Sequence, residues 1–409
     1  MAVDFHQGAG LSLSILTLND QLPVRGVPDR LARRVPFPVL ESIMQIKAAV
    51  ARVQGAPLSI EALDIEDPRD NEILVKVVAT GVCHTDLVVR DGMLPTPLPV
   101  VLGHEGAGIV TKVGRAISKV DVGDHVVMTF NSCGRCPSCQ DHHVSYCHEF
   151  FPRNFFAARA DGTSALSKQG ERINGNFFGQ SSFACHAICH EANVVKVDAK
   201  FDLELLGPLA CGIQTGAGAV MNALKISAGK SFAVFGAGSV GLSALMAARV
   251  VGAATIVAVD TNDDRLAMAR ELGATHTINP TRVDATEEIT KITGYGVNFA
   301  LDTTGIAAVI RGAVMSLAPM GTCGILGASA MGTEITLDEV HFMSGGRRLM
   351  GIVEGESVPE VFIPMLAELN AQGRFPFDRL VKFYSLDQIN EAIHDSETGR
   401  TIKPIVRMS

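Results

Sequence analysis

The sequence predicts an α/β protein in which a β-rich region precedes a region built around a doubly wound parallel sheet. From residue 44 to about 210 the apolar segments are short and are interrupted by frequent glycines and prolines, which is typical of compact β structure. From about residue 213, strand-like segments alternate with helix-like ones, which indicates βαβ units. A chain of 409 residues is too long for one ordinary domain, so two domains, or three small ones, are expected.

Strands in the β-rich region are predicted where apolar and β-branched residues cluster, at 44–52, 72–82 and 107–114. In the second region, the segment SFAVFGAGSVGLSALMAARV at 231–250 is predicted to form a strand, a glycine turn and an apolar helix. The remaining predicted elements are strands at 255–260, 297–302 and 322–327 and a helix at 359–371.

Residues 1–43 differ from the rest of the chain, because they mix Pro, Arg and Asp without a sustained period. We expect a poorly ordered extension, or a start codon assigned too far upstream, ahead of a new start at Met44. A targeting role is the alternative. The apolar stretch at 11–18 is, however, too short to span a membrane and lacks the basic lead-in of a secretory signal.

Composition excludes several classes of partner. The formal net charge of −8 argues against nucleic acid and anionic membranes, which need a basic surface. Nine cysteines in a chain of this length do not indicate a disulfide framework, and four of them lie within fifteen positions. Free thiols fit a reducing compartment, so a cytoplasmic protein is expected.

A dinucleotide site is predicted at Gly236, Gly238 and Gly241, which form the pattern G-A-G-S-V-G between an apolar strand and an apolar helix. The glycines let the backbone approach a pyrophosphate, and the helix N-terminus offers free N–H groups. Asp260, nineteen residues beyond Gly241, can accept hydrogen bonds from ribose hydroxyls and would repel a 2′-phosphate. NAD is therefore favoured over NADP, and the alternative is a glycine turn that binds nothing.

A structural metal site is predicted from four cysteines spaced C-x2-C-x2-C-x7-C, at Cys133, Cys136, Cys139 and Cys147. Four thiolates satisfy tetrahedral zinc and leave no open position. An iron–sulfur cluster is the rival, but the C-x3-C-P continuation of ferredoxin-type sites is missing.

Three further residues, Cys83 in GVCHTD, His104 in GHEGAG and Cys211 in GPLACGIQTGAG, are singly compatible with buried thiols or a core histidine. Their order, together with the four-cysteine loop and the glycine turn, resembles the zinc-containing medium-chain alcohol dehydrogenases over essentially all of residues 44–409. The resemblance implies a GroES-like catalytic domain at 44–212, a Rossmann NAD-binding domain at 213–353, and a return to the catalytic domain at 354–409.

The resemblance also implies roles at the catalytic metal. Cys83, His104 and Cys211 match the family's zinc ligands, and three protein ligands leave a fourth position for water or alcohol. Glu105 matches an acid beside the metal that helps exchange ligands, Asp86 the carboxylate that orients the ligand histidine, and Thr85 the hydroxyl that takes the alcohol's proton. With the four-cysteine site, two zinc ions per chain are expected.

On the cofactor side, the resemblance implies that His84 contacts the cofactor phosphate, Asp260 the ribose and Arg265 the adenosine. Lys403 aligns roughly with a basic residue near the pyrophosphate. One position departs from the family pattern: many members carry a histidine where Val88 stands, as the outer end of a proton relay. Valine cannot move a proton, so the proton is expected to leave Thr85 through the ribose hydroxyl and water, or via another group.

The segments VCHTDLVVRDG, FFGQSSFACHA and GIVEGESVP resemble the bacterial aryl-alcohol (benzyl alcohol) dehydrogenases within this family. Phe183 falls where the family places an aromatic wall of the substrate pocket, and Phe130 is a weaker candidate, although core packing explains either ring equally well. We therefore expect reversible oxidation of an aromatic primary alcohol to its aldehyde by hydride transfer to NAD, in a homodimer or homotetramer. The alternatives are cinnamyl or terpenoid allylic, aliphatic or polyol substrates, or a non-catalytic zinc- and nucleotide-binding protein.

Overall fold

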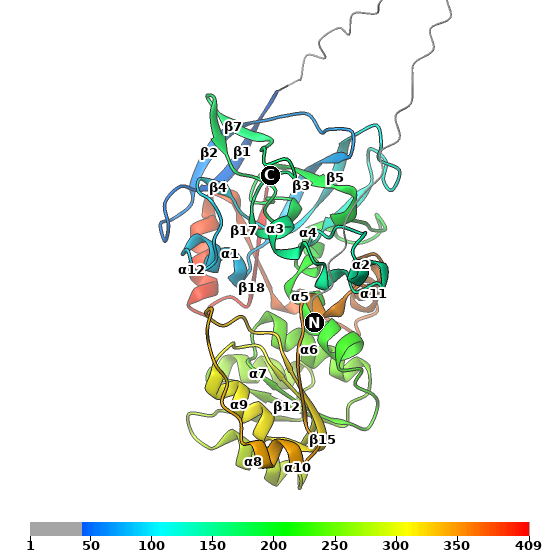
Figure 1. The fold of residues 1–409 in the computed structure, drawn as a ribbon, viewed down its shortest axis with the longest axis vertical. Coiled ribbons are helices and arrows are strands. Elements are labelled where there is room, and N and C mark those ends of the chain that lie inside the picture. The colour runs from blue at the N-terminus through cyan, green and yellow to red at the C-terminus, as the bar shows by residue number, and fades with distance from the viewer. Residues whose placement is uncertain (1–42, 409) are drawn as a thin grey trace, which may run out of the picture. The chain divides into compact units, whose positions relative to one another are not determined.

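The computed structural model describes residues 43–408, so the predicted extension 1–43 lies outside the described residues apart from Ile43. Within that described part, no helix is long and apolar enough to cross a membrane. The described chain forms three sheets, two of them mainly antiparallel and one parallel (Figure 1).

The first antiparallel sheet has the strand order β4-β1-β2-β7-β8. Its strands are β1 (Met44–Ala51), β2 (Ser59–Ile65), β4 (Val100–Val101), β7 (Leu166–Lys168) and β8 (Glu171–Ile173). β1 pairs with β2 along almost its whole length, from Met44 opposite Ile65 to Val50 opposite Ser59. This sheet packs apolar side chains such as Ile46, Val50 and Leu63 into one hydrophobic core.

The second antiparallel sheet has the order β10-β6-β5-β3-β18-β17, with β9 also pairing with β3. Its strands are β3 (Glu72–Gly81), β5 (Glu105–Val113), β6 (His125–Met128), β9 (His186–His190), β10 (Val194–Lys196), β17 (Val381–Ser385) and β18 (Lys403–Arg407). The C-terminal strand β18 pairs with β3, with Ile405 opposite Gly81. The end of the chain therefore lies beside the strand that leads to Cys83.

The parallel sheet has the order β13-β12-β11-β14-β15-β16. Its strands are β11 (Ser231–Phe235), β12 (Thr255–Val259), β13 (His276–Ile278), β14 (Val297–Asp302), β15 (Leu317–Ile325) and β16 (Arg348–Gly351). From β11 the chain continues to β12 on one side, and later strands add on the other side beyond β14. β11 and β14 therefore flank the topological switch point, where such sheets bind their ligands.

Helices cover both faces of this parallel sheet. They are α6 (Ser239–Val250), α7 (Asp263–Leu272), α8 (Ala285–Thr293), α9 (Ala307–Met315) and α10 (Glu339–Ser344). Along β11, Phe232 packs in the same cluster as Leu245 of α6, whereas Phe235 packs with Val314 of α9. Since successive side chains of a strand point to opposite faces, β11 is buried on both sides, as a doubly wound sheet requires.

The remaining helices are short, except α11. They are α1 (His84–Arg90), α2 (Pro137–Gln140), α3 (Phe150–Phe155), α4 (Leu203–Leu206), α5 (Gly212–Gly218), α11 (Pro359–Ala371) and α12 (Ile389–Glu397). α5 packs closely on α6. The two helices are so close that a Cβ added at Gly216 would lie 2.0 Å from the Val240 carbonyl oxygen. Only glycine permits that approach, and it brings the end of the β-rich region against the first helix of the parallel sheet.

The predicted α/β fold class is confirmed, as are the predicted strands corresponding to β1, β3, β5, β11, β12 and β14. The predicted helix at 359–371 matches α11. β15 begins at Leu317, five residues before the predicted start, because its first half carries Pro, Met and Gly rather than a strand-like apolar run. The short helices α1 and α3 were not predicted, since one or two turns are too short to show a helical period. The domain boundaries themselves stay a prediction.

Candidate active site and metal centres

The structure brings together Cys83, His104, Glu105 and Cys211, whose ligand atoms all lie within 4.8 Å of one another. Cys83 immediately precedes α1, His104 and Glu105 stand at the start of β5, and Cys211 immediately precedes α5. The residues are far apart in the sequence, so only the sheet pairing and the packing of α5 assemble them. His104 and Glu105 are fully buried, as expected for a metal centre rather than a surface cluster.

Asp86 fixes the ring of His104. The His104 Nδ1 atom lies 2.9 Å from Asp86 Oδ1, and both side chains are buried. The other ring nitrogen, Nε2, is buried and has no hydrogen-bond partner among the described residues. A buried nitrogen without a partner is costly, so this atom fits a metal ligand whose tautomer the Asp86 carboxylate sets.

The titratable groups of the cluster shift one another's pKa values. A hydrogen bond from Cys211 holds the pKa of the Cys83 thiol well below its usual value, against the effect of burial. The same hydrogen bond, together with burial, raises the pKa of Cys211 well above its usual value. Burial opposes protonation of His104, yet the charges of Asp86 and Cys83 outweigh it and raise the pKa of the imidazole. Two thiolates and one imidazole are a zinc donor set with room for a fourth ligand.

Two phenylalanine rings cover the imidazole of His104. Phe178 stacks on it with ring centroids 4.6 Å apart, and Phe177 meets it edge-on at 5.7 Å. Both belong to a short 3-10 turn, Phe177–Gly179, in which Phe178 has the left-handed backbone conformation (φ 50°). The sequence motif FFGQSSF contains these rings, but the prediction selected Phe183 in the same motif.

Glu105 forms a buried ion pair with Lys403. The Lys403 Nζ atom lies 2.9 Å from each carboxylate oxygen and 3.3 Å from the Val82 carbonyl oxygen. Glu105 Oε1 also accepts a hydrogen bond from the Gly212 N–H, next to Cys211. Burial raises the pKa of Glu105, and Lys403 opposes that shift. Lys403 was predicted to lie near the cofactor pyrophosphate; the structure places its ammonium group on Glu105, and the cofactor role stays a prediction.

Thr85 lies close to the metal cluster, with its hydroxyl oxygen 3.8 Å from Cys83 Sγ. His84, next to it at the start of α1, is exposed, and Val88 one turn later is half-buried. Arg90 is held by acids, since its guanidinium pairs with Asp91 and Glu397 at 2.7 Å each. The roles of Thr85 in proton transfer and of His84 in cofactor binding stay predictions.

Glu354 is an acid at the centre that sequence reasoning missed. Its carboxyl oxygen Oε1 lies 3.7 Å from Cys211 Sγ, and Oε2 accepts a hydrogen bond from the Thr215 hydroxyl at 3.2 Å. Only 8% of the residue is exposed, and burial raises the pKa of its carboxyl to about 7. The only signal in the sequence was an acid between an apolar strand and a glycine in GIVEGES, which is too common to indicate a site.

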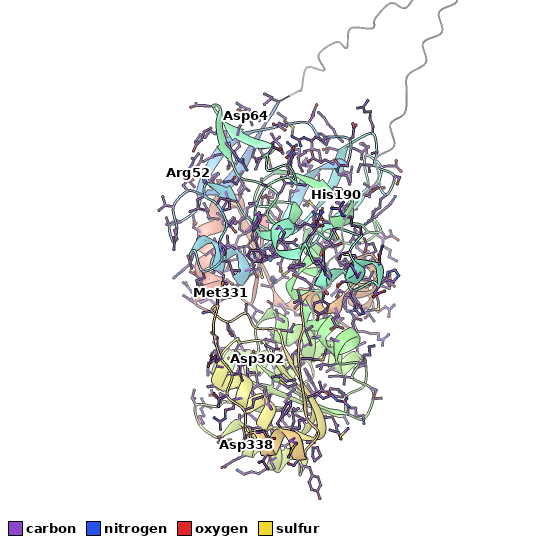
Figure 2. The ribbon with its side chains drawn as sticks, in the orientation of Figure 1. Arg52, Asp64, His190, Asp302, Met331 and Asp338 are labelled. Atoms are coloured by element: carbon purple, nitrogen blue, oxygen red, sulfur yellow. The ribbon has the colours of Figure 1, made fainter. Side chains whose placement is uncertain are left out.

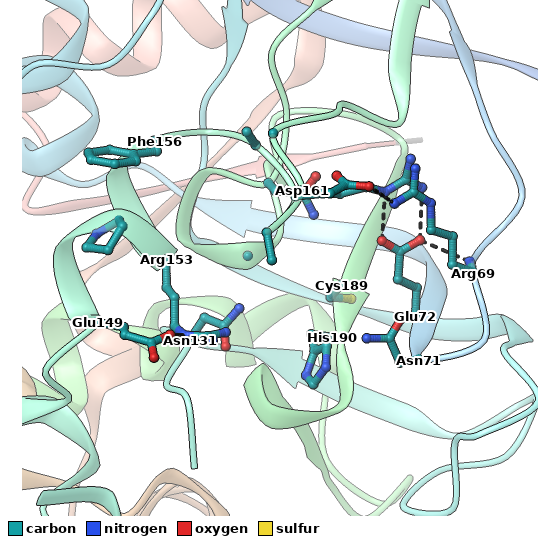
Figure 3. A pocket seen from close by; sticks show the side chains of 17 residues that line it. Arg69, Asn71, Glu72, Asn131, Glu149, Arg153, Phe156, Asp161, Cys189 and His190 are labelled. Carbon is teal, nitrogen blue, oxygen red and sulfur yellow. Dashed lines mark hydrogen bonds and ion pairs between the residues drawn. The ribbon is translucent and has the colours of Figure 1, made fainter. Parts of the chain in front are cut away.

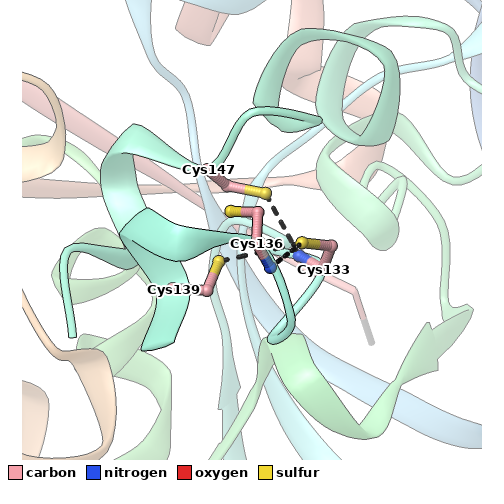
Figure 4. A group of neighbouring side chains, drawn as sticks. All are labelled: Cys133, Cys136, Cys139 and Cys147. Atoms are coloured by element: carbon pink, nitrogen blue, oxygen red, sulfur yellow. Dashed lines mark hydrogen bonds between the residues drawn. The ribbon is translucent and has the colours of Figure 1, made fainter. Parts of the chain in front are cut away.

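The four predicted structural ligands, Cys133, Cys136, Cys139 and Cys147, also converge, with sulfur atoms within 4.8 Å of one another (Figure 4). Backbone N–H groups point at the sulfurs. The Cys133 N–H donates to Cys147 Sγ at 3.2 Å, and the Cys136 N–H donates to Cys133 Sγ at 3.3 Å. A hydrogen bond from the His148 N–H is the main reason that the pKa of Cys136 falls to about 6. Burial raises the pKa of Cys139 and raises that of Cys147 to about 12, so the loop favours thiolates at only part of the site. The convergence of four sulfurs fits a closed four-sulfur zinc site.

The glycine turn has the geometry of a dinucleotide cradle. Gly236 has φ +97°, and a Cβ at Gly241 would lie 1.8 Å from the Gly236 carbonyl oxygen. A Cβ at Gly238 would instead point into open space, so the backbone there is accessible. Gly238 precedes α6 and provides no side-chain cap, which leaves the first N–H groups of the helix available to a phosphate.

Asp260 follows β12 and lies at this turn. Its Oδ2 atom accepts a hydrogen bond from the Ala237 N–H at 2.7 Å, and Oδ1 accepts one from the Asn262 N–H at 2.8 Å. Arg265, predicted near the adenosine, has its guanidinium Nη1 3.9 Å from Asp260 Oδ2. The carboxylate is thus oriented beside the cradle, where a ribose acceptor is required.

Phe183 and Phe130, the predicted walls of the substrate pocket, are almost completely buried in the hydrophobic core. Phe183 packs so tightly on Gly103 that a Cβ there would lie 2.5 Å from its ring. Phe130 lies with its ring centroid 5.8 Å from that of Phe150. Their role as pocket walls stays a prediction.

A cavity of about 460 Å³ lies away from both metal clusters' ligands, between Arg69, Arg153 and His190 (Figure 3). Its charged groups are already paired: Arg69 with Asp161, Arg153 with Glu149, and Arg159 with Glu72. The predicted catalytic and cofactor residues do not line it. It is therefore not the site of the chemistry.

Comparison with known proteins identifies the family to which this chain belongs. The family model for an alcohol dehydrogenase GroES-like domain matches residues 69–199, and the model for a zinc-binding dehydrogenase matches residues 239–371. Geraniol dehydrogenase from Castellaniella defragrans is 46% identical over 368 residues, 90% of this chain and 98% of that protein.

Two solved structures are similar as well. Benzyl alcohol dehydrogenase from Acinetobacter calcoaceticus has a TM-score of 0.88 and 49% identity, covering 90% of this chain and 100% of that one. An alcohol dehydrogenase zinc-binding domain protein from Burkholderia ambifaria has a TM-score of 0.89 and 54% identity, with the same coverage. The chain belongs to the zinc-dependent medium-chain alcohol dehydrogenase family.

This membership confirms the predicted architecture, a GroES-like domain and a Rossmann-like domain. The protein is an alcohol dehydrogenase, and zinc and NAD are consistent with its relatives. The geometry on this chain agrees with both cofactors: two sets of convergent ligands suit zinc, and a glycine turn with an oriented acid suits NAD.

The selectivity for NAD is tested by Asp260→Ala. Since charge-assisted hydrogen bonds contribute about 1.5–3 kcal/mol, kcat/KM with NAD is expected to fall about 10- to 100-fold. Activity with NADP should hold or rise, because the repulsive carboxylate is gone. Asp264→Ala, which removes an exposed acid of α7 four residues further along the chain, is the matched control and should leave the ratio unchanged. A wild-type enzyme that prefers NADP would contradict the role of Asp260.

Proposed function

We propose that the protein reversibly oxidises an aromatic primary alcohol of the benzyl alcohol type to its aldehyde, with NAD as the hydride acceptor. The observation that carries the proposal is the convergence of Cys83, His104 and Cys211, with the rings of Phe177 and Phe178 packed on the imidazole of His104. Apolar, aromatic surroundings suit a planar substrate ring. The similarity to a benzyl alcohol dehydrogenase supports the same substrate class.

Terpenoid allylic alcohols are the second candidate, because a geraniol dehydrogenase is similar to this chain to about the same extent. Benzylic and allylic alcohols share a carbinol carbon next to a π system, and an apolar pocket discriminates only weakly between them. Polyols are disfavoured, since the side chains packed on His104 are aromatic rings rather than hydrogen-bonding groups. A non-catalytic role is disfavoured because all three zinc ligands are present and converge.

In the proposed mechanism, Cys83, His104 and Cys211 hold the catalytic zinc, and Asp86 keeps the His104 tautomer that leaves Nε2 free to bind it. When bound, zinc supplies Lewis acidity that lowers the pKa of the alcohol. The other four cysteines, at 133–147, hold a second zinc that is structural.

Thr85 accepts the hydroxyl proton of the substrate. Its hydroxyl lies at the metal cluster, whereas Val88 one turn along α1 offers no group to carry the proton further. Beyond Thr85, α1 therefore supplies no side chain for the proton, and a ribose hydroxyl of bound NAD would offer the next group. NAD bound at the glycine turn would supply the acceptor for the carbinol hydrogen, which would take the two electrons that the alcohol loses as a hydride.

Glu105 and Lys403 form a buried ion pair at the proposed zinc ligands. Glu105 is among the four groups whose ligand atoms converge, so its carboxylate is close enough to exchange with another ligand. The buried ammonium of Lys403 holds both of its oxygens and offsets its charge. Phe183 and Phe130 stay our proposed walls of the substrate pocket and His84 and Arg265 our proposed cofactor contacts, whereas the ammonium group of Lys403 is held on Glu105.

We also infer that the protein is a homo-oligomer, a dimer or a tetramer. Val340 and Met343 of α10 are strongly exposed, on the helix that precedes the edge strand β16 of the parallel sheet. Figure 2 labels Asp338, the residue before α10, and shows Met331 at the opposite end of this sheet region. Exposed apolar side chains beside an unpaired strand edge are typical of a protein interface. A cytoplasmic location is proposed because all nine cysteines, each in the described part, are free thiols.

The oligomeric state is tested by measuring the mass in solution with light scattering. Two or four chains per particle are expected. Met343→Lys, which places a charge in the apolar segment, should shift the particle toward single chains, whereas Val122→Lys, exposed on the β-rich region, should not. A wild-type protein that runs as a single chain at all concentrations would overturn the inference.

The substrate class is tested with an NAD-linked assay across benzyl, cinnamyl, geranyl, short aliphatic and polyol substrates. Benzyl alcohol is expected to give the highest kcat/KM, about 100-fold above polyols, because an aromatic pocket leaves polyol hydroxyls without partners. Cys211→Ser should remove turnover while NAD still binds, which separates loss of the metal from loss of the cofactor. A clear preference for geraniol would replace the aromatic assignment by the allylic one, and a preference for polyols would refute both.

A further inference from the structure

The turn that carries Glu354 has an unusual backbone. Three consecutive residues, Glu354, Gly355 and Glu356, have positive φ values of 48°, 64° and 49°. Non-glycine residues avoid this left-handed region, so two of them in one turn persist only where the surroundings hold them there. Such strain is found most often at functional sites.

The turn is held on two sides. Gly355 packs against α5, since a Cβ at Gly218 would lie 2.3 Å from the Gly355 carbonyl oxygen. The same oxygen accepts a hydrogen bond from the Asn222 side chain at 3.2 Å. On the other side, Glu356 Oε1 accepts a hydrogen bond at 2.9 Å from the hydroxyl of Tyr146, the residue before the structural ligand Cys147.

In this turn, the carboxyl group of Glu354 contacts two side chains, one just before α5 and one in its first turn. One carboxyl oxygen lies 3.7 Å from the sulfur of Cys211, and the other accepts the Thr215 hydroxyl at 3.2 Å. The Thr215 N–H in turn donates to the Cys211 carbonyl oxygen at 2.9 Å. Cys211 itself has an irregular backbone (φ −142°, ψ −87°), so the helix does not fix its side chain. The carboxyl group of Glu354 supplies that constraint.

The turn that carries Glu354 also connects the parallel sheet to the metal cluster. Glu354 stands three residues after β16, the edge strand of the parallel sheet that carries the glycine cradle. Cys211 stands at the end of the β-rich region. Glu354 is therefore a direct contact between the segment that follows the cofactor-binding sheet and a ligand of the catalytic metal.

We propose that Glu354 is a positioning residue for the catalytic metal centre, which fixes the Cys211 sulfur by spanning it and the Thr215 hydroxyl. The proposal rests on the proposed zinc ligand Cys211 and adds a residue that the resemblance to the family did not supply. In the structure the Cys211 thiol donates to Glu354 Oε1, whereas a glutamine amide would donate to the sulfur, so glutamine keeps both partners with the direction of the sulfur contact reversed. Alanine removes both.

The test uses the holoenzyme with its catalytic zinc exchanged for Co²⁺, which reports ligand geometry through its thiolate-to-metal absorption band. Glu354→Ala should shift this band, and the zinc enzyme should lose its catalytic zinc to a chelator about 10-fold faster, the usual scale for residues that orient metal ligands. Glu354→Gln should restore the wild-type band and rate. NAD affinity should stay within about twofold in both variants.

The matched control is Glu356→Ala, which alters the same strained turn but removes the contact to Tyr146 instead of Cys211. It should leave the cobalt band unchanged. If Glu354→Ala does not fold, Thr215→Val provides the second variant, since it removes the hydroxyl that holds Oε2 and should shift the band in the same direction. An unchanged band in the variant that folds, or an equal shift in Glu356→Ala, would overturn the proposal.

The same spectra separate this proposal from the ligand assignment on which it rests. Cys211→Ser should change the cobalt band strongly, because one thiolate is lost. A strong change in Cys211→Ser with no change in Glu354→Ala would refute only the role of Glu354. No change in Cys211→Ser would refute the ligand assignment itself.

Discussion

The geometry of the catalytic site depends on the carboxylate of Asp86. Its Oδ1 atom accepts hydrogen bonds from His104 Nδ1 and from the Gly103 N–H, and its Oδ2 atom accepts one from the Cys83 N–H. One buried acid thus orients one ligand and ties the segment of a second ligand to it. Because an unpartnered buried carboxylate is strongly destabilising, these three donors hold one another in place.

Cys211, the third proposed ligand, is held by different contacts. Cys211 comes from a segment that packs under α6, and its position depends on glycines that permit close contact, on the Thr129 hydroxyl donating to the neighbouring Ala210 carbonyl, and on Glu354. The C-terminal strand β18 adds the counter-charge, since its pairing with β3 places Lys403 beside Glu105. The site is therefore complete only when the C-terminal strand β18 and the segments that carry Cys83, His104 and Cys211 have all folded.

Two of these sites could be predicted from the sequence, because their residues lie close together along the chain. The glycine turn with Asp260 and the loop from Cys133 to Cys147 are short, self-contained patterns whose chemistry dictates their spacing, and the structure places their residues together. The assembly of Cys83 with His104 and Cys211 followed only from resemblance to a family, because no local spacing joins residues from separate segments.

The features that escaped prediction are those that depend on tertiary packing. Nothing in the sequence shows that Phe178, rather than Phe183, stacks on His104, because the choice is made by a left-handed backbone conformation in one turn. Likewise, the contact of Glu354 with Cys211 joins residues 143 positions apart. Lys403 was expected at the pyrophosphate, and its partner Glu105 becomes visible only once β18 is paired with β3.

The assignment of Cys83, His104 and Cys211 as catalytic zinc ligands is tested most directly by X-ray diffraction from crystals of the zinc-loaded protein at the zinc absorption edge. Two anomalous peaks per chain are expected, one among the four sulfurs of Cys133, Cys136, Cys139 and Cys147 and one bonded to Cys83 Sγ, His104 Nε2 and Cys211 Sγ. A single peak in the four-cysteine loop, with none at His104, would contradict the assignment.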